Sequence, residues 1–339
     1  MTQATGPTTG ERDQLLEVAR ELAVEQLGPR SASIDEGDAS ALAESWRRVA
    51  QVGLDRAIVP EAKGSACLVA DDLLAAIEEL AFGDGGIAMS VLLSNASMLC
   101  VRPEQMPQVE DGGRWAFVPV RPGSELKVNE GRLDGRVESA IGACGAARLV
   151  LALSGPEPTS FVIDAGADGV LVDRDEAQMG LRGAPAASVT LKGVDGSVTG
   201  GVPGPALALL NAGTAAIARG ISRRAFELAL EYAKTRTQGG VAIIDHDAVG
   251  DMLSAMTVRL GCPLPRFGGI AVALGAKIAA TDGAVATTQD AVQVFGGTGY
   301  MHDTGVEKLM RDAKYCQLFP EPNWIAQREL LGLEPWTRR

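Results

Sequence analysis

A glycine turn preceded by a polar amide is the most informative stretch of the sequence. Residues 291–300 read Ala-Val-Gln-Val-Phe-Gly-Gly-Thr-Gly-Tyr, so the apolar end of a helix runs directly into Gly296 and Gly297. Paired glycines favour a helix stop and let a ligand or another backbone approach closely. Gln293 stands one turn before that stop, and its amide both donates and accepts hydrogen bonds. The pattern predicts a polar ligand lying across the turn.

The remaining reactive side chains exclude several other chemistries. The chain has only two histidines, so a histidine-based metal site or a Ser-His-Asp triad has little material. The cysteines are scattered, odd in number and without a CxxC pair, which is typical of reduced, buried thiols in a cytoplasmic protein. They are Cys67, Cys100, Cys144, Cys262 and Cys316. A formal net charge of −12 argues against nucleic acid as a partner. We therefore expect no metal site and a cytoplasmic location.

Composition favours close-packed helices around a large core. Of the 339 residues 46% are hydrophobic but only 4% are aromatic, and alanine and leucine are abundant. Residues 1–10 are polar and contain no apolar leader segment. No run of ~18 apolar residues occurs, so a membrane span is not expected.

The hydrophobic periodicity of the elements that must position the turn changes twice along the chain, from helical to strand-like and back to helical. Apolar residues recur at helical spacing up to Leu99, then short apolar runs alternate with turn residues from Trp115 to Leu191, and helical spacing returns at Pro203. No helical pattern in the middle third is long enough for a parallel crossover. Helices are expected over 11–27, 39–53, 70–81 and 87–99, and strands over 115–120, 133–137, 149–153, 160–163, 169–172 and 187–191.

This order predicts a mainly α fold with a central antiparallel β domain. The expected boundaries are an N-terminal helical domain over residues 1–103, a β domain over 104–197 and a C-terminal helical domain over 198–339. In the last domain, Arg219, Arg223, Glu227 and Glu231 recur at i, i+4 spacing. Such a polar stripe predicts a solvated helix face.

Three segments together resemble the acyl-CoA dehydrogenase family. Residues 291–300 are similar to its flavin-binding signature, Val-Gln-x-Phe-Gly-Gly-x-Gly-Tyr, and Val306 to Lys314 is similar to the helix that follows it. Tyr232 to Gly240 resembles the family's Tyr-Ala-x-x-Arg-x-Gln-Phe-Gly. The resemblance implies the helical, β, helical domain order and an FAD-dependent oxidoreductase. Its substrate would be an acyl thioester, on CoA or on a carrier protein.

The resemblance also implies a set of cofactor contacts. These are Arg236, Gln238, Gln293, Phe295, Gly296 and Gly297. In the family the arginine and the glutamine of the Tyr-Ala segment reach the FAD of a neighbouring subunit. The planar, permanently charged fork of Arg236 suits a pyrophosphate, although an arginine at a helix end also meets the helix dipole. Gly239 replaces the family's phenylalanine, which removes one packing contact.

The β domain departs further from the family pattern. The family places Thr-Glu-Pro and Gly-Ser-Asp against substrate and flavin, and here Pro122, Gly123 and Ser124 survive while the threonine is lost. Ser124 is accordingly the expected substrate contact. The segment from Gly135 to Ile141 lacks the family's second threonine as well, so a hydroxyl near the flavin ring is missing.

The family's reaction needs a carboxylate base. It removes two hydrogens from the Cα–Cβ bond of the acyl group: the carboxylate takes the α proton and the flavin takes the β hydride. Such a base works in an apolar, sealed pocket, where desolvation raises its pKa towards the working pH. The usual base is the glutamate of a Tyr-Glu-Gly-Thr loop after the Arg-Asp-Ala-Lys helix, which here spans Arg311 to Lys314.

The residue at that loop position is unusual. An alignment without gaps places Pro320 at the expected glutamate, with Glu321 one residue later. Such a slip moves a side chain by ~3.5 Å, several times the tolerance of oriented proton transfer. Some family members carry the base on an earlier helix, where this chain has Leu210, with Asn211 in place of a nearby arginine. Either Glu321 acts as base from a loop stiffened by Pro320 and Pro322, or it is an exposed carboxylate and the base is absent.

Two functions therefore remain open. The first is an FAD-dependent acyl-thioester dehydrogenase with Glu321 as base and an electron-transfer flavoprotein or similar acceptor as partner. The second is a catalytically degenerate subunit of a heteromeric acyl-CoA dehydrogenase that completes a partner's FAD site. Leu260 to Gly269 holds two prolines and three glycines, so the family's long helical hairpin is shortened here. A homo- or hetero-oligomer, dimer or tetramer, is expected, with subunit packing that this shortening alters.

Overall fold

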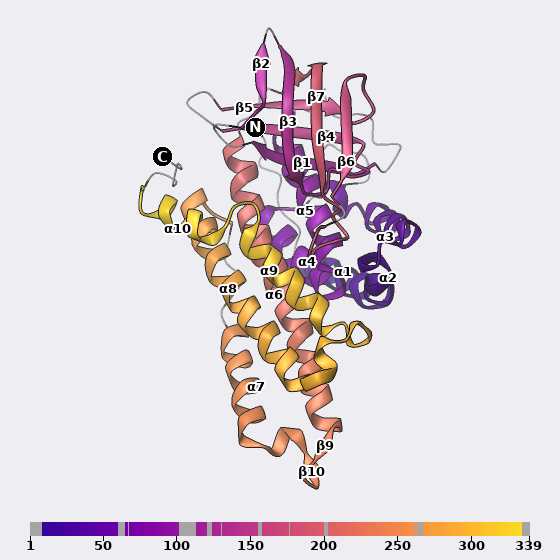
Figure 1. Cartoon of the computed structure of the whole chain (residues 1–339), viewed down its shortest axis with the longest axis vertical. Helices are drawn as coiled ribbons and strands as arrows, with labels where there is room; N and C mark the ends of the chain where they lie inside the picture. Colours follow the sequence, from indigo (N-terminus) through magenta and orange to yellow (C-terminus); the bar gives the residue numbers. More distant parts are fainter. Residues whose placement is uncertain are drawn as a thin grey trace.

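In the computed structural model the β domain forms one end of the molecule, and the long C-terminal helices run from beside it to the other end (Figure 1). The structure describes residues 9–59, 65–66, 68–101, 113–120, 124–129, 131–154, 158–175, 177–199, 203–261, 263 and 267–333. Pro122, Gly123, Cys67 and Cys262 lie outside these residues, as does the expected boundary near residue 103. Cys100, Cys144 and Cys316 are free thiols, and the first and last of these are buried.

Two of the N-terminal helices, α3 and α5, begin where an aspartate side chain caps them. Asp38 accepts hydrogen bonds from the amides of Ser40 and Ala41 at the start of α3, and Asp84 accepts from Ile87 at the start of α5. Nearly all of α5 is buried, as expected for an uncharged helix. The helices are α1 (Thr9–Glu21), α2 (Ser31–Asp35), α3 (Ala39–Gln51), α4 (Ala70–Gly83) and α5 (Gly85–Leu99), with a π-helical turn at Leu22–Leu27.

The β domain consists of two four-stranded sheets. Their orders are β1-β4-β5-β8 and β2-β3-β7-β6. The strands are β1 (Trp115–Val120), β2 (Lys127–Asn129), β3 (Arg132–Ala140), β4 (Arg148–Leu153), β5 (Thr159–Asp164), β6 (Val170–Arg174), β7 (Ala187–Asp195) and β8 (Ser197–Val198). Apolar side chains between the two sheets form a second core, whereas the opposite face of β1 and β4, with Trp115, Phe117 and Val150, belongs to the helical core. One detail differs from the expected antiparallel arrangement: β1 pairs with β4 in parallel, because the chain passes through β2 and β3 of the other sheet between them.

Long helices build the C-terminal part. They are α6 (Pro203–Thr235), α7 (Asp247–Leu260), α8 (Ile270–Phe295), α9 (Val306–Leu318) and α10 (Asn323–Leu330), with the short pair β9 (Thr237–Gln238) and β10 (Val241–Ala242) after α6. In Figure 1, α6 extends from beside the β domain to the opposite end, where β9 and β10 lie. As expected, α7 ends at Leu260 and a new helix begins only at Ile270.

The polar stripe of α6 is not simply a solvated face. Arg219 and Arg223 reach across to α4, where both bind Glu78 and Arg223 also binds Glu79. The four side chains are 11–23% exposed, so these ion pairs lie at a helix interface. The prediction from i, i+4 spacing was wrong for this half of the stripe, because the sequence does not show which helix faces α6.

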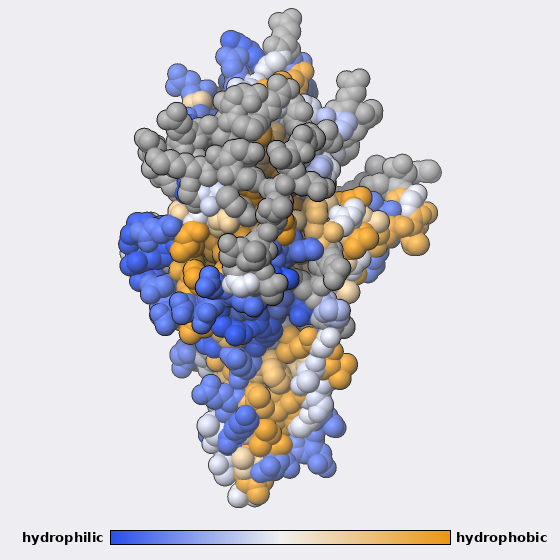
Figure 2. All heavy atoms as spheres, turned by 180° about the vertical axis from the view of Figure 1, so that it is seen from behind, coloured by the Kyte–Doolittle hydropathy of each residue, from blue (hydrophilic) through white to orange (hydrophobic). Residues whose placement is uncertain are grey.

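The outer face of α8 is unusually apolar for a surface helix. The segment Ile270–Tyr300 is long and apolar enough to cross a membrane by length and composition, a test that the core helix of a soluble protein also passes. Only 33% of its most apolar window is buried in a single chain. Figure 2 shows hydrophobic residues gathered in a band along the helical part of the molecule. Val272 on α8 and Val258 on α7 are among the exposed apolar residues.

Candidate functional site

The ends of α6 and α8 meet, and an aromatic stack joins them. The rings of Tyr232 and Phe295 lie 4.2 Å apart between centroids, with 13° between their planes. Tyr232 lies one turn before Arg236, and Phe295 is followed directly by Gly296. The stack therefore brings the two sequence motifs expected to contact the cofactor to the same end of the helical bundle. It also commits one face of the Phe295 ring to Tyr232.

The polar groups at this end face outward. Arg236, Gln238 and Gln293 are all exposed, and their side chains make no hydrogen bond or ion pair with other residues that the structure describes. His246 holds the β9 backbone in place, with Nε2 3.2 Å from the carbonyl oxygen of Gln238. The guanidinium and the two amides are thus available to a molecule outside the chain.

The glycine turn presents open backbone. Gly296 ends α8 at φ +60°, a conformation that side-chain-bearing residues rarely adopt. A Cβ added at Gly296 or Gly297 would meet no atom of the described residues within 4 Å. The positive φ of Gly296 accounts for that glycine, whereas neither conformation nor packing among the described residues requires Gly297, which close approach of a ligand or a second subunit would explain. Exposed amides, a guanidinium and bare backbone fit the polar and phosphate groups of FAD.

The segment that carries Glu321 lies against another part of α8. Lys277, wholly buried, donates from Nζ to the carbonyl oxygens of Gln317 at 3.2 Å and of Glu321 at 2.5 Å. Asn323 donates to Thr281 Oγ1 and to Asp282 Oδ1. Glu321 is half-buried rather than a freely exposed loop carboxylate.

The structure separates the expected site residues into two groups. Lys277, beside Glu321, and Gln293, beside the glycine turn, are sixteen residues apart on one straight helix, which at 1.5 Å per residue is about 24 Å. Ser124 is exposed in the β domain, beyond the end of β1. One chain thus does not bring its glycine turn and its Glu321 to the same place.

The alternative base position offers no carboxylate. Leu210 and Asn211 are both buried in α6, and Asn211 Nδ2 donates to the carbonyl of Leu207. Asn211 Oδ1 is buried without a hydrogen-bond partner among the described residues. This orphan acceptor marks the position where the family pattern carries an arginine, but it cannot replace a base.

A buried ionic cluster locks α9, and with it the Glu321 segment, to the rest of the chain. Lys308 Nζ lies 2.7 Å from Asp312 Oδ2 and 3.2 Å from Asp84 Oδ2. Asp312 Oδ1 accepts from the amide of Leu181, a residue at φ +54° in the β domain. Burial lowers the pKa of Lys308, but the two carboxylates outweigh it and raise the pKa above its ordinary value. One cluster thus ties together the N-terminal, β and C-terminal parts.

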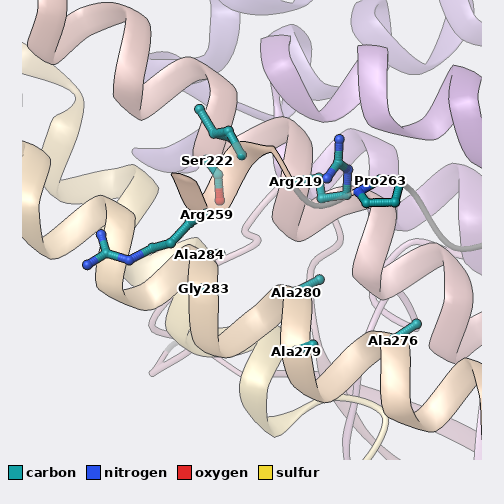
Figure 3. A pocket seen from close by; sticks show the side chains of 10 residues that line it. Arg219, Ser222, Arg259, Pro263, Ala276, Ala279, Ala280, Gly283 and Ala284 are labelled. Carbon is teal, nitrogen blue, oxygen red and sulfur yellow. The ribbon is translucent and has the colours of Figure 1, made fainter. Parts of the chain in front are cut away.

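A cleft of about 200 Å³ lies between α6, α7 and α8 and is shown in Figure 3. Alanines of α8, among them Ala276 and Ala280, form one wall, and Arg219 and Arg259 stand on the other side. Both arginines already bind carboxylates, Glu78 and Asp290. Glu321 is not among the residues that line this cleft, so the cleft is not the pocket in which the expected base would act.

Sequence reasoning missed the α8 residues that hold the Glu321 segment, namely Lys277, Thr281 and Asp282. The available signal was charge: α8 contains one lysine and two aspartates among otherwise uncharged residues. A buried cation is costly unless it is hydrogen-bonded, so a lone lysine in an apolar helix suggests a specific acceptor. Which acceptor it is depends on tertiary structure.

Comparisons with known proteins agree with the fold and with the motifs. The acyl-CoA dehydrogenase N-terminal domain model matches residues 9–104, and the acyl-CoA dehydrogenase C-terminal domain model matches residues 206–262 and 264–320. A cyclohex-1-ene-1-carbonyl-CoA dehydrogenase of Geobacter metallireducens is 28% identical over 94% of this chain and 96% of the relative.

Solved structures show the same fold at lower identity. Butyryl-CoA dehydrogenase from Megasphaera elsdenii has a TM-score of 0.81 at 21% identity, over 97% of this chain and 99% of that one. An acyl-CoA dehydrogenase complexed with FAD from Bacillus anthracis has a TM-score of 0.83 at 16% identity, over 97% of this chain and 67% of that one. The fold class, the flavin cofactor and the type of oxidoreductase expected from the sequence are confirmed at the level of the family. This chain belongs to the acyl-CoA dehydrogenase family.

Proposed function

We propose that this chain is an FAD-dependent acyl-thioester dehydrogenase in which Glu321 is the base. The observation that carries the proposal is the meeting of the α6 and α8 ends. The exposed side chains of Arg236, Gln238 and Gln293 lie at this end of the bundle with the glycine turn, and no intrachain hydrogen bond among the described residues uses them. The family, shown by both domain models, supplies the reaction type.

The residues have distinct roles in this proposal. Arg236 pairs with the pyrophosphate, while Gln238, Gln293 and the turn amides hold polar groups of the dinucleotide. Ser124 contacts the thioester substrate. Glu321 removes the α proton, and FAD, when bound, accepts the hydride that leaves Cβ. The substrate loses one proton and one hydride, and a Cα–Cβ double bond forms.

The separation within the chain requires a second subunit. Because Gln293, beside the glycine turn, and Lys277, which binds the Glu321 backbone, lie about 24 Å apart along α8, a turn that contacts FAD serves the active site of a neighbour. The exposed apolar face with Val258 and Val272 provides surface for such a neighbour. The oligomer is formed by copies of this chain or with a related chain, and an electron-transfer flavoprotein or similar protein reoxidises the flavin.

Colour gives the first test. Protein purified after expression alone is expected to show yellow, FAD-like absorbance, because the exposed motif residues then face a flavin held in a homo-oligomer. Arg236→Met and Gln293→Leu should each lower the flavin content without lowering helix content by circular dichroism. A colourless preparation that gains flavin only with a co-expressed partner would instead support the degenerate-subunit function.

Deuterium exchange at Cα gives the second test. Purified protein in deuterated water is expected to exchange the α proton of an acyl-CoA, and Glu321→Gln should abolish this exchange because it removes the only proton acceptor proposed. Glu329→Gln, on the exposed surface of α10, is the matched control and should exchange normally. Equal exchange by the Glu321→Gln and unmodified proteins would remove Glu321 from the role.

A further inference from the structure

Lys277 is an unusual residue for its surroundings. Its side chain is completely buried in α8, and its ammonium donates to two backbone carbonyls of a segment forty or more positions later. Burying a cation has a large desolvation cost, which hydrogen bonds to well-placed acceptors offset. A methionine or leucine would fill an apolar helix face without this cost. The ammonium therefore does something that packing alone does not require.

The two acceptors lie on either side of the segment's turn. Gln317 is in the last turn of α9, and Glu321 is the residue proposed as base, so one ammonium fixes both ends of the intervening stretch. The hydroxyl of Thr281, one turn along α8, donates to the carbonyl of Lys277 at 2.8 Å and accepts from Asn323 at 2.9 Å.

Asp282 completes the attachment with a second kind of contact. Its Oδ1 accepts at 2.7 Å from the side-chain amides of both Gln317 and Asn323. Backbone contacts through Lys277 and side-chain contacts through Asp282 therefore grip the segment at residues before and after Glu321. We refer to Lys277, Thr281 and Asp282 as the α8 clamp.

We propose that Lys277 is a positioning residue of the dehydrogenase reaction: through its bonds to the backbone at Gln317 and Glu321 it sets where the Glu321 carboxylate lies. The inference rests on the proposed function, because it assumes that Glu321 is the base. It accounts for how a base displaced by one residue, between two prolines, keeps a defined position. Misplacing a reacting group by about 1 Å can cost about 100-fold in rate.

The test compares Lys277→Met with Lys277→Arg and with Lys314→Met. Lys314 is the matched control because it is exposed and, among the described residues, bonds only the side chain of Gln317, at 2.7 Å. Hydrogen–deuterium exchange of the backbone amides in 317–323 reports the clamp directly. Exchange of the substrate α proton and the KM for an acyl-CoA report its consequence, and flavin absorbance reports assembly.

Lys277→Met is expected to speed amide exchange in 317–323 and to slow α-proton exchange by about 100-fold, with KM changed by less than about threefold. Lys277→Arg should restore part of the rate, and Lys314→Met should match the unmodified protein. Unchanged amide protection in Lys277→Met, or an equal loss in Lys314→Met, would overturn the inference.

Two further outcomes distinguish a failure of the Lys277 inference from a failure of the proposed role of Glu321 as base. If Lys277→Met does not fold, Asn323→Ala removes one side of the clamp and should loosen 317–323 in the same way; no loosening counts against the inference. If the unmodified protein exchanges no α proton, the proposed function fails. The effect of Lys277→Met on amide protection then shows whether the clamp itself is present.

Discussion

Lys308 shows how much a single buried charge contributes in this protein. It lies between Asp312 and Asp84, and its side chain is 8% exposed. Removing the cation leaves two buried carboxylates without their counter-charge, a change that typically costs about 3–5 kcal/mol. We expect Lys308→Met to lower the free energy of unfolding in urea by that amount. A loss below about 1 kcal/mol would mean that the cluster contributes little.

Asp35, close to Lys308 and Arg311, makes the stability of this region depend on pH. Burial pushes its pKa upward, but hydrogen bonds and charge from Arg311 outweigh burial and hold the pKa below its ordinary value. A carboxyl whose pKa is lower in the folded state stabilises the fold above its unfolded pKa of about 3.9, and loses this contribution as pH falls through the folded value.

The acid unfolding of Asp35→Asn tests this sign. The variant should melt at a lower temperature than the unmodified protein at pH 7, and the difference should shrink as pH falls below about 4. Asp38→Asn is a suitable comparison, because Asp38 caps α3 on the surface and contacts no arginine among the described residues. A difference that grows towards low pH would contradict the assignment.

At the scale of elements, α6 and α4 touch through a glycine. A Cβ on Gly220 would lie 2.3 Å from the carbonyl oxygen of Glu78. Because this oxygen belongs to the backbone of α4, it cannot move without shifting the helix. We expect Gly220→Ala to destabilise by about 1–3 kcal/mol, as overpacking does. Gly10→Ala, at an exposed position of α1 where a Cβ meets no atom of the described residues within 4 Å, should instead be neutral or slightly stabilising. Urea unfolding of both variants checks the contrast.

Elements with strong periodicity were predictable, and those fixed by distant partners were not. The bounds of β1 matched the expected strand, and α4 and α5 lay within two residues of their expected ends. The short α2, β2 and β8 were missed, because a few residues carry little periodic signal. The parallel pairing of β1 with β4 depends on a partner about thirty residues away, so no local pattern indicates it.

The candidate site shows the same division. Local sequence signals identified the glycine turn and its flanking amides, because the chemistry of a glycine turn is local. The α8 clamp that binds the Glu321 segment was not predictable, since Lys277 contacts Gln317 only in the folded chain. That Phe295 stacks on Tyr232 was likewise invisible in the sequence, where the two residues lie far apart.

At the scale of the whole molecule, one helix serves two separate places. The first half of α8 holds the segment of Glu321 through Lys277, and Gln293, beside the glycine turn, lies about 24 Å further along the helix. The first turn of α8, ahead of Lys277, exposes the apolar residues Ile270 and Val272, which are 40% and 57% exposed. These features agree if α8 packs against another subunit and its turn completes that subunit's flavin site.

This arrangement predicts that assembly and flavin retention are lost together. Val272→Lys places a charge on the apolar face of α8 without touching Arg236 or the glycine turn, so it should weaken subunit association through desolvation of the added charge. We expect light scattering after size-exclusion chromatography to show smaller species, with flavin absorbance falling in proportion. Val18→Lys, at an exposed position of α1, should leave both unchanged. Since the turn and the guanidinium remain intact in Val272→Lys, a monomer that keeps its full flavin content would show that one chain binds FAD without a neighbour.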